Sequence, residues 1–183
     1  GRTVLRRVDP GRPPEGEPVR HPWVIEDVVP SPDGTRIAVV DSEWRASTWQ
    51  LEPPVQQPIR IPAGRTVAAR PRDSILATGG VDGGVRWTAE NGLGAALGSA
   101  QLRGAVRVLR YSPGGRWLVA GTVEGEVRLW DGESRGPGRS LEWASGLVRS
   151  ISFSSDEAVV AVLGRNSDLR FFATADGRAL GPV

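Results

Sequence analysis

The sequence contains no cysteine, no methionine and no lysine among its 183 residues, and it has a single histidine, His21. Without cysteine the chain can form no disulfide, no thiolate metal site and no thiol nucleophile. The single histidine argues against a histidine-based metal site or catalytic triad, and His21 is the only candidate general base of that type. No apolar run approaches the roughly 18 residues that a membrane-spanning helix requires. We therefore expect a cytoplasmic protein that is not an enzyme, holds no metal or other cofactor and does not enter a membrane.

What the sequence does contain is a repeat. Four turn-forming segments begin at Ser31, Arg70, Ser112 and Ser154, so the spacings are 39, 42 and 42 residues. A period of about 40 residues is typical of stacked supersecondary units, none of which can bury its apolar face alone. The 24 glycines and 15 prolines agree with a turn-rich, all-β chain.

Each repeat carries three short apolar segments that are separated by turn residues. The segments are rich in β-branched and aromatic residues, and none has the 3.6-residue period of a helix, so we predict strands and no helix. A weaker fourth strand follows each third one, at 19–20, 59–61, 102–103, 141–142 and Leu180. The pattern predicts an all-β β-propeller array of four-stranded antiparallel blades. The approximate boundaries are 24–61, 64–103, 105–142 and 147–183, with 1–20 supplying strands of a preceding or closing blade.

The third repeat carries the most specific motif. Residues 112–131 read SPGGRWLVAGTVEGEVRLWD, and 75–87 read ILATGGVDGGVRW. The chain resembles the WD-repeat (WD40-like) β-propeller family, and the lack of lysine, cysteine and methionine indicates a bacterial type from a GC-rich genome. The resemblance implies a rigid propeller that presents loops to other proteins, as a scaffold or sensor within a larger multidomain signalling protein.

Two departures from the family pattern affect this expectation. The Trp-Asp pair occurs only as Trp130-Asp131, and His21 alone could supply the bracing histidine, so the blades should depend mainly on apolar packing. The chain also begins in the middle of a blade and ends where the next blade would start. We expect a segment of a longer propeller, which needs further blades from the parent chain or another chain to close the ring. A small four-bladed ring is the alternative.

The residues expected to bind a partner come from two sets of loops. Trp44-Arg45 stands where the other repeats have Gly83-Gly84, Gly125-Glu126 and Ser167-Asp168. A tryptophan at a turn position with positive φ carries a conformational cost, and an exposed tryptophan beside arginine is typical of a binding hot spot. Packing of Trp44 onto a neighbouring blade is the equal alternative. The family resemblance places these turns on the same face as the connections that enter the first strands. The predicted protein- or peptide-binding residues are Trp23, Trp44, Arg45, Asp82, Glu124, Trp143 and Arg165.

Two other functions stay open. An enzyme site could lie at the mouth of the propeller channel, where scattered carboxylates such as Asp41 and Glu124 would have to converge. Nucleic acid could bind an arginine-lined face, because Arg65, Arg107 and Arg149 occupy equivalent places in consecutive repeats. The net charge is only +2, however, and backbone binding depends on clustered cations. This weak charge argues against nucleic acid.

Overall fold

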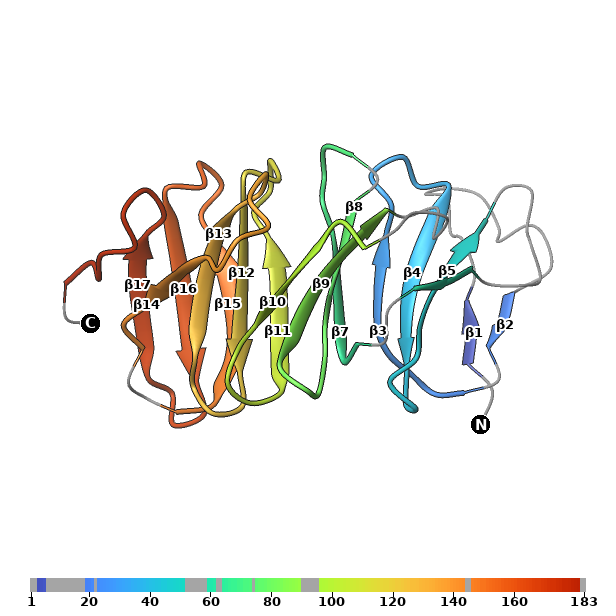
Figure 1. The fold of residues 1–183 in the computed structure, drawn as a ribbon, viewed down its shortest axis with the longest axis horizontal. Coiled ribbons are helices and arrows are strands. Elements are labelled where there is room, and N and C mark those ends of the chain that lie inside the picture. Colours follow the sequence, from blue (N-terminus) through green and yellow to red (C-terminus); the bar gives the residue numbers. More distant parts are fainter. Residues whose placement is uncertain are drawn as a thin grey trace, which may run out of the picture.

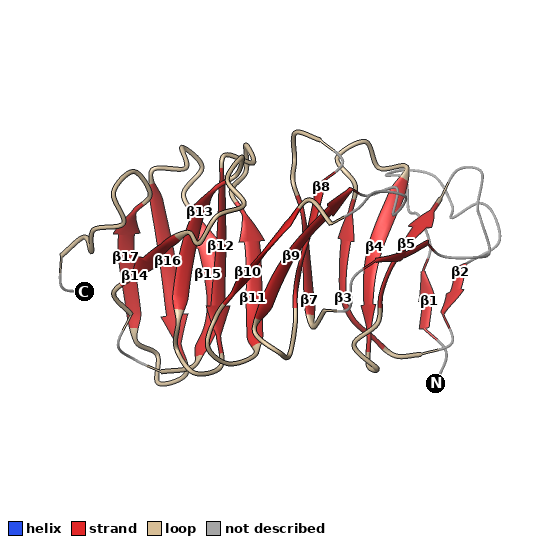
Figure 2. Ribbon diagram, viewed as in Figure 1, coloured by secondary structure: helices blue, strands red, loops and turns tan. Residues whose placement is uncertain are grey.

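The computed structural model describes residues 3–5, 19–21, 23–51, 59–61, 64–73, 75–89, 96–143 and 146–181. These residues form strands and turns and no helix (Figure 2). Four antiparallel sheets stand side by side in sequence order along the long axis of the molecule (Figure 1). The predicted all-β array of antiparallel blades is therefore confirmed.

We call the four sheets blades 1 to 4, and within each the strands follow one another as a meander. Blade 1 contains β3 (Ile25–Pro30), β4 (Arg36–Asp41), β5 (Ala46–Gln50) and β6 (Ile59–Ile61). Blade 2 contains β7 (Thr66–Ala69), β8 (Ile75–Gly79), β9 (Gly84–Ala89) and β10 (Gly98–Gln101). Blade 3 contains β11 (Val106–Tyr111), β12 (Trp117–Thr122), β13 (Val127–Asp131) and β14 (Arg139–Leu141). Blade 4 contains β15 (Val148–Phe153), β16 (Val159–Gly164) and β17 (Leu169–Ala173), and β1 (Thr3–Leu5) pairs with β2 (Val19–His21) before blade 1.

The fourth strands differ most from the prediction. The strand expected at 102–103 lies earlier, at Gly98–Gln101, and the strand expected at Leu180 is reduced to a single bridge between Phe172 and Ala179. The sequence Gly-Ser-Ala-Gln of β10 alternates between half-buried and exposed positions without a large apolar side chain. Hydrophobic periodicity therefore had no signal with which to locate it.

The core lies between the blades. Trp87 of blade 2 meets Trp130 of blade 3 edge to face, with ring centroids 5.7 Å apart and planes at 77°. Glycine at the ends of the second strands permits the close approach of the next blade. A Cβ on Gly79 would lie 2.5 Å from Cγ1 of Val106, and one on Gly121 would lie 2.5 Å from Cγ1 of Val148. Blade 3 thus packs closely against blade 2, and blade 4 against blade 3, with valine side chains lying against glycine backbone.

The turns between the first and second strands are closed by a recurrent side-chain hydrogen bond. Ser31 Oγ donates to Asp33 Oδ1 at 2.6 Å, and Ser154 Oγ donates to Asp156 Oδ1 at 2.5 Å. The backbone N–H of Thr35 donates to the Asp33 carboxylate at 3.0 Å. These bonds stabilise the ionised carboxylates: the pKa of Asp33 is lowered to about 2, chiefly by the Ser31 hydroxyl, and the pKa of Asp156 is lowered likewise by Ser154.

Because of the hydrogen bonds in these turns, we expect the folded protein to lose stability in acid. Because the Asp33 pKa is lowered from 3.8 in the unfolded chain to about 2, its contribution is complete above about pH 4 and disappears as the pH falls towards 2. The Asp33→Asn variant should therefore melt below the wild type at pH 5, and the gap should narrow towards pH 2. Thermal unfolding between pH 5 and pH 2 measures the gap. Glu124→Gln, an exposed carboxylate outside these turns, is the control, and a gap independent of pH would contradict the assignment.

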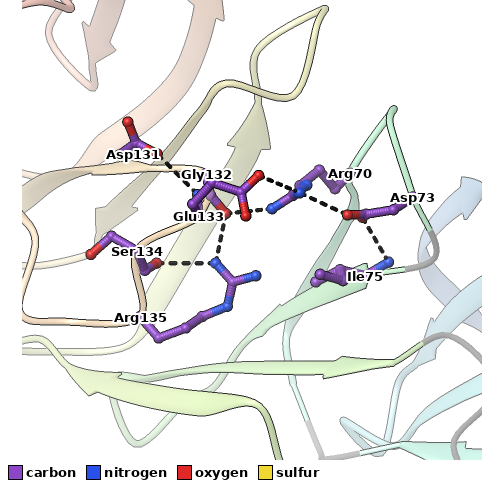
Figure 3. Close-up of polar contacts among 8 residues, drawn as sticks. All are labelled: Arg70, Asp73, Ile75, Asp131, Gly132, Glu133, Ser134 and Arg135. Atoms are coloured by element: carbon purple, nitrogen blue, oxygen red, sulfur yellow. Dashed lines mark hydrogen bonds and ion pairs between the residues drawn. The ribbon is translucent and has the colours of Figure 1, made fainter.

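Blade 2 departs from this turn in an informative way. Arg70 stands where the other blades have serine, and its side chain is buried, with 5% of the residue exposed. Its Nη1 donates to the Gly132 carbonyl at 2.6 Å, and its Nη2 pairs with Glu133 Oε1 and Asp73 Oδ2, each at 2.7 Å (Figure 3). Arg70 therefore ties the first turn of blade 2 to the turn that follows β13 of blade 3.

Candidate functional site

The turns between the second and third strands of all four blades lie on one face, at the bottom of Figure 1, with the connections that enter the first strands. We call this the turn face. One position in each turn has positive φ: 59° at Trp44, 82° at Gly83, 90° at Gly125 and 65° at Ser167. Trp44 thus adopts the conformation of its glycine counterparts, at a cost of roughly 1–2 kcal/mol for a residue with a Cβ.

Packing accounts for the position of the Trp44 ring. The ring is half-buried against the core between blades 1 and 2, near Ala46 and Val67. The guanidinium carbon of Arg65, which enters blade 2, lies 5.2 Å from the ring centroid. In the structure Trp44 therefore packs onto the neighbouring blade, as in the alternative prediction. Trp44 also lines the first of the two cavities described below.

Trp23 and Arg45 form a stacked pair on the turn face. The guanidinium carbon of Arg45 lies 4.4 Å from the centroid of the Trp23 ring, which is 43% exposed. Arg45 Nε is held by Asp41 Oδ2 at 3.2 Å, and Asp41 is itself buried. An aromatic ring and a cation are therefore presented together with their relative orientation already set.

Trp143 does not join this pair. Its side chain lies in the core between blades 3 and 4, with 8% of the residue exposed, and its indole Nε1 donates to the Gly146 carbonyl at 2.7 Å. A partner on the turn face could not reach the ring. The candidate surface therefore excludes Trp143.

The other predicted residues lie on the turn face but apart from one another. Asp82 is paired with Arg86 in its own blade, and the Arg86 hydrogen bond is the main reason that the Asp82 pKa is lowered to about 2. Glu124 and Arg165 are exposed in the turns of blades 3 and 4. The structure therefore brings together Trp23 with Arg45, and Trp44 with Arg65, but it leaves Asp82, Glu124 and Arg165 as separate surface charges.

A cavity of about 300 Å³ lies where the first strands approach the turn face. Four arginines line it, together with Trp44 and two carboxylates. Asp27 is already engaged, because its Oδ2 accepts hydrogen bonds from Thr66 Oγ1 at 2.9 Å and from the Val67 N–H at 3.1 Å. The lining charges are Arg65, Arg107, Arg110, Arg149, Glu26 and Asp27.

A second cavity, of about 330 Å³, lies further along the first strands and shares Arg110 with the first. Its walls are mainly apolar and include Tyr111, Ile151 and Phe153. Burial raises the pKa of the Tyr111 phenol to about 12, so this side chain stays neutral. The inner surface of the array is therefore cationic towards the turn face and apolar beyond it.

Within the described ranges, no group of three or more histidine, cysteine, aspartate or glutamate side chains could hold a metal ion. His21 belongs to β2, and its side chain is outside the described part of the chain. No helix in the described residues is long and apolar enough to cross a membrane.

Antiparallel blades of three or four strands, packed face to face and joined by short turns, define the chain as a β-propeller array. Comparison with solved structures confirms this fold. A chain from the crystal structure of the mitotic checkpoint complex superimposes with a TM-score of 0.74 at 19% identity, over 86% of this chain and 50% of that one.

Sequence comparisons support the resemblance of this chain to the WD40 repeat family. Residues 98–131 match the family model described as "WD domain, G-beta repeat". The chain is 35% identical over 122 residues to the WD repeat-containing protein SL1-17 of Schistosoma mansoni, which covers 64% of this chain and 38% of that protein. It is 36% identical over 63 residues to the ribosome biogenesis protein BOP1 of Homo sapiens, over 34% of this chain and 8% of that protein. It is 32% identical over 120 residues to telomerase protein component 1 of Rattus norvegicus, over 63% of this chain and 4% of that protein.

These relatives are eukaryotic, so they give no support to the predicted bacterial, high-GC type. The chain spans less than two fifths of the length of each of them.

Proposed function

We propose that this chain is a non-enzymatic protein-interaction module whose turn face binds a protein or peptide. WD40 propellers generally bind protein partners, and the solved chain with the similar fold comes from a protein complex. The observation that carries the proposal is the exposed Trp23–Arg45 stack, since tryptophan and arginine are the side chains most enriched at binding hot spots. The expected role as a sensor or scaffold in a multidomain signalling protein rests on the family resemblance, and the expected cytoplasmic location rests on the sequence alone.

The Trp23–Arg45 stack has a matched control at the opposite end of the blades. Arg116 lies in the turn that enters β12, and its guanidinium carbon is 5.2 Å from the centroid of the Trp117 ring at the start of that strand. This pair has the same chemistry but faces away from the turn face. Variants of the two arginines therefore separate recognition on the turn face from a general effect of losing a stacked cation.

We predict that Trp23→Ala and Arg45→Ala each reduce retention of a bound partner by roughly tenfold, the effect of losing about 1.4 kcal/mol at a hot spot. Arg116→Ala should leave retention unchanged. Quantitative mass spectrometry of proteins captured from a lysate of the source organism by the immobilised wild type and variants measures the ratios. Thermal unfolding of each variant verifies that the fold is kept. Equal capture by all three variants and the wild type would refute the turn-face proposal.

A further inference from the structure

We propose that the inner surface formed by the first strands binds an extended acidic peptide. Its carboxylates would pair with Arg65, Arg107 and Arg149, and a neighbouring apolar side chain would occupy the second cavity beside Phe153. This inference rests on the proposed function and names the chemistry of the partner.

The cavity next to the turn face carries more positive than negative charge. Among the residues the structure describes, Arg107, Arg110 and Arg149 have no hydrogen-bond or ion-pair partner, although they line the same cavity. Of the two carboxylates present, Asp27 is already bonded to Thr66 and Val67. The cavity therefore has an excess of cations, and the planar guanidinium fork matches a carboxylate with two parallel hydrogen bonds.

Arg65 is held in position before any ligand binds. Arg65 is stacked on Trp44, with 5.2 Å between its guanidinium carbon and the ring centroid, and the Trp44 ring is fixed by the core between blades 1 and 2. The Gly64 N–H also donates to the Trp44 carbonyl at 3.2 Å, which joins the two segments through the backbone. A cation already held in place loses less conformational entropy when an anion binds.

The two cavities follow one another along β11. Arg107 lines the cationic cavity, Tyr111 lines the apolar cavity, and Arg110 lines both. Tyr111 follows Arg107 by four positions along the strand, or about 13 Å at the usual rise per residue. An extended peptide lying along β11 would therefore place its acidic residues about four positions from its apolar anchor.

The same features favour a peptide over nucleic acid. Glu26 and Asp27 line the cationic cavity and would repel a continuous run of phosphates. Of the charged residues, only Arg110 lines the apolar cavity. A short acidic cluster followed by an apolar side chain fits this distribution, whereas a polyanion does not.

Fluorescence anisotropy with a synthetic ten-residue peptide tests the inference. The peptide carries two adjacent glutamates and, four positions further on, a phenylalanine. We expect saturable binding that weakens with salt and falls at least roughly tenfold when both glutamates are replaced by glutamine. Arg107→Gln and Arg149→Gln should each lower the affinity by a similar factor. Arg165→Gln removes an exposed arginine of the turn face outside the cavity and should have no effect.

The inference would be overturned by no binding of the peptide, by equal binding of the glutamate and glutamine peptides, or by unchanged affinity in Arg107→Gln and Arg149→Gln. Tighter binding of a ten-nucleotide single strand than of the peptide would also overturn it and would favour nucleic acid. If the peptide fails while capture still depends on Trp23 and Arg45, this inference alone is wrong. If that dependence is absent too, the proposed function fails with it.

Discussion

Replacing Trp87 with alanine should lower the free energy of unfolding by about 4 kcal/mol, the largest loss that we expect from any single substitution. Trp87 is 1% exposed and lies between blades 2 and 3, where it meets the edge of Trp130 at 5.7 Å between ring centroids. The guanidinium carbon of Arg135 covers it at 5.5 Å from the centroid. Truncation would remove the aromatic pair and the cation contact and would leave a cavity at the centre of the array.

Urea unfolding followed by far-ultraviolet circular dichroism measures the loss without depending on tryptophan fluorescence. Trp23→Ala is the matched control, because this ring is 43% exposed and its removal should cost less than about 1 kcal/mol. Trp130→Phe should lie between the two, since it keeps an aromatic ring but loses the hydrogen bond from Nε1 to the Gly136 carbonyl at 2.9 Å. A Trp87→Ala loss no larger than that of Trp23→Ala would contradict the assignment of Trp87 to the central contact.

The neighbour that Trp87 contacts could not be predicted from the sequence. Aligning the repeats places Thr88 in the position of Trp49 and Trp130, and Trp87 one residue earlier. Adjacent strand residues point to opposite faces of a sheet, so Thr88 and Trp87 face different neighbours. Both are buried, at 3% and 1% exposure. When both faces of a blade are covered, the apolar pattern predicts burial but does not tell which neighbour a side chain meets.

The candidate site, like the fold, could be predicted from the sequence only in part. The equivalence of Arg65, Arg107 and Arg149 is visible in the repeat, because it depends only on position along the chain. That they share a cavity with Trp44 depends on how the blades pack, which no local pattern encodes. Trp143 was predicted on the surface because it falls outside the strand registers, yet the connection that carries it folds over the core between blades 3 and 4. Connections lack the periodicity that would reveal such burial.

Arg70 is the clearest case of a residue whose role is invisible locally. In the sequence it is an irregular member of a turn that has serine in the other three blades. Its hydrogen-bond partners Gly132 and Glu133 are 62 and 63 residues away. The only signal in the sequence is the departure from the repeat.

We expect Arg70→Ala to lower the free energy of unfolding by about 2 kcal/mol, because it removes charge-assisted bonds from a guanidinium that is almost fully buried. The loss should stay below the 3–5 kcal/mol typical of a broken, fully buried ion pair. The Glu133 side chain is 80% exposed and can be hydrated, and the Gly132 carbonyl keeps a second donor in Arg135 Nη1 at 2.6 Å. Urea unfolding again measures the difference.

Arg70→Ser separates the two roles that this position could have. Serine would supply the hydroxyl that in the other three blades accepts a hydrogen bond from the backbone N–H five residues later, at 2.9 Å for Ser31, 3.0 Å for Ser112 and 3.0 Å for Ser154. If Arg70 served only its own turn, Arg70→Ser would equal the wild type. Because its bonds reach blade 3, we expect Arg70→Ser to remain nearly as destabilised as Arg70→Ala, while Arg72→Ala, an exposed arginine of the same turn, changes stability by less than about 0.5 kcal/mol. A stable serine variant would show that the bonds from Arg70 to blade 3 contribute little to the stability of the protein.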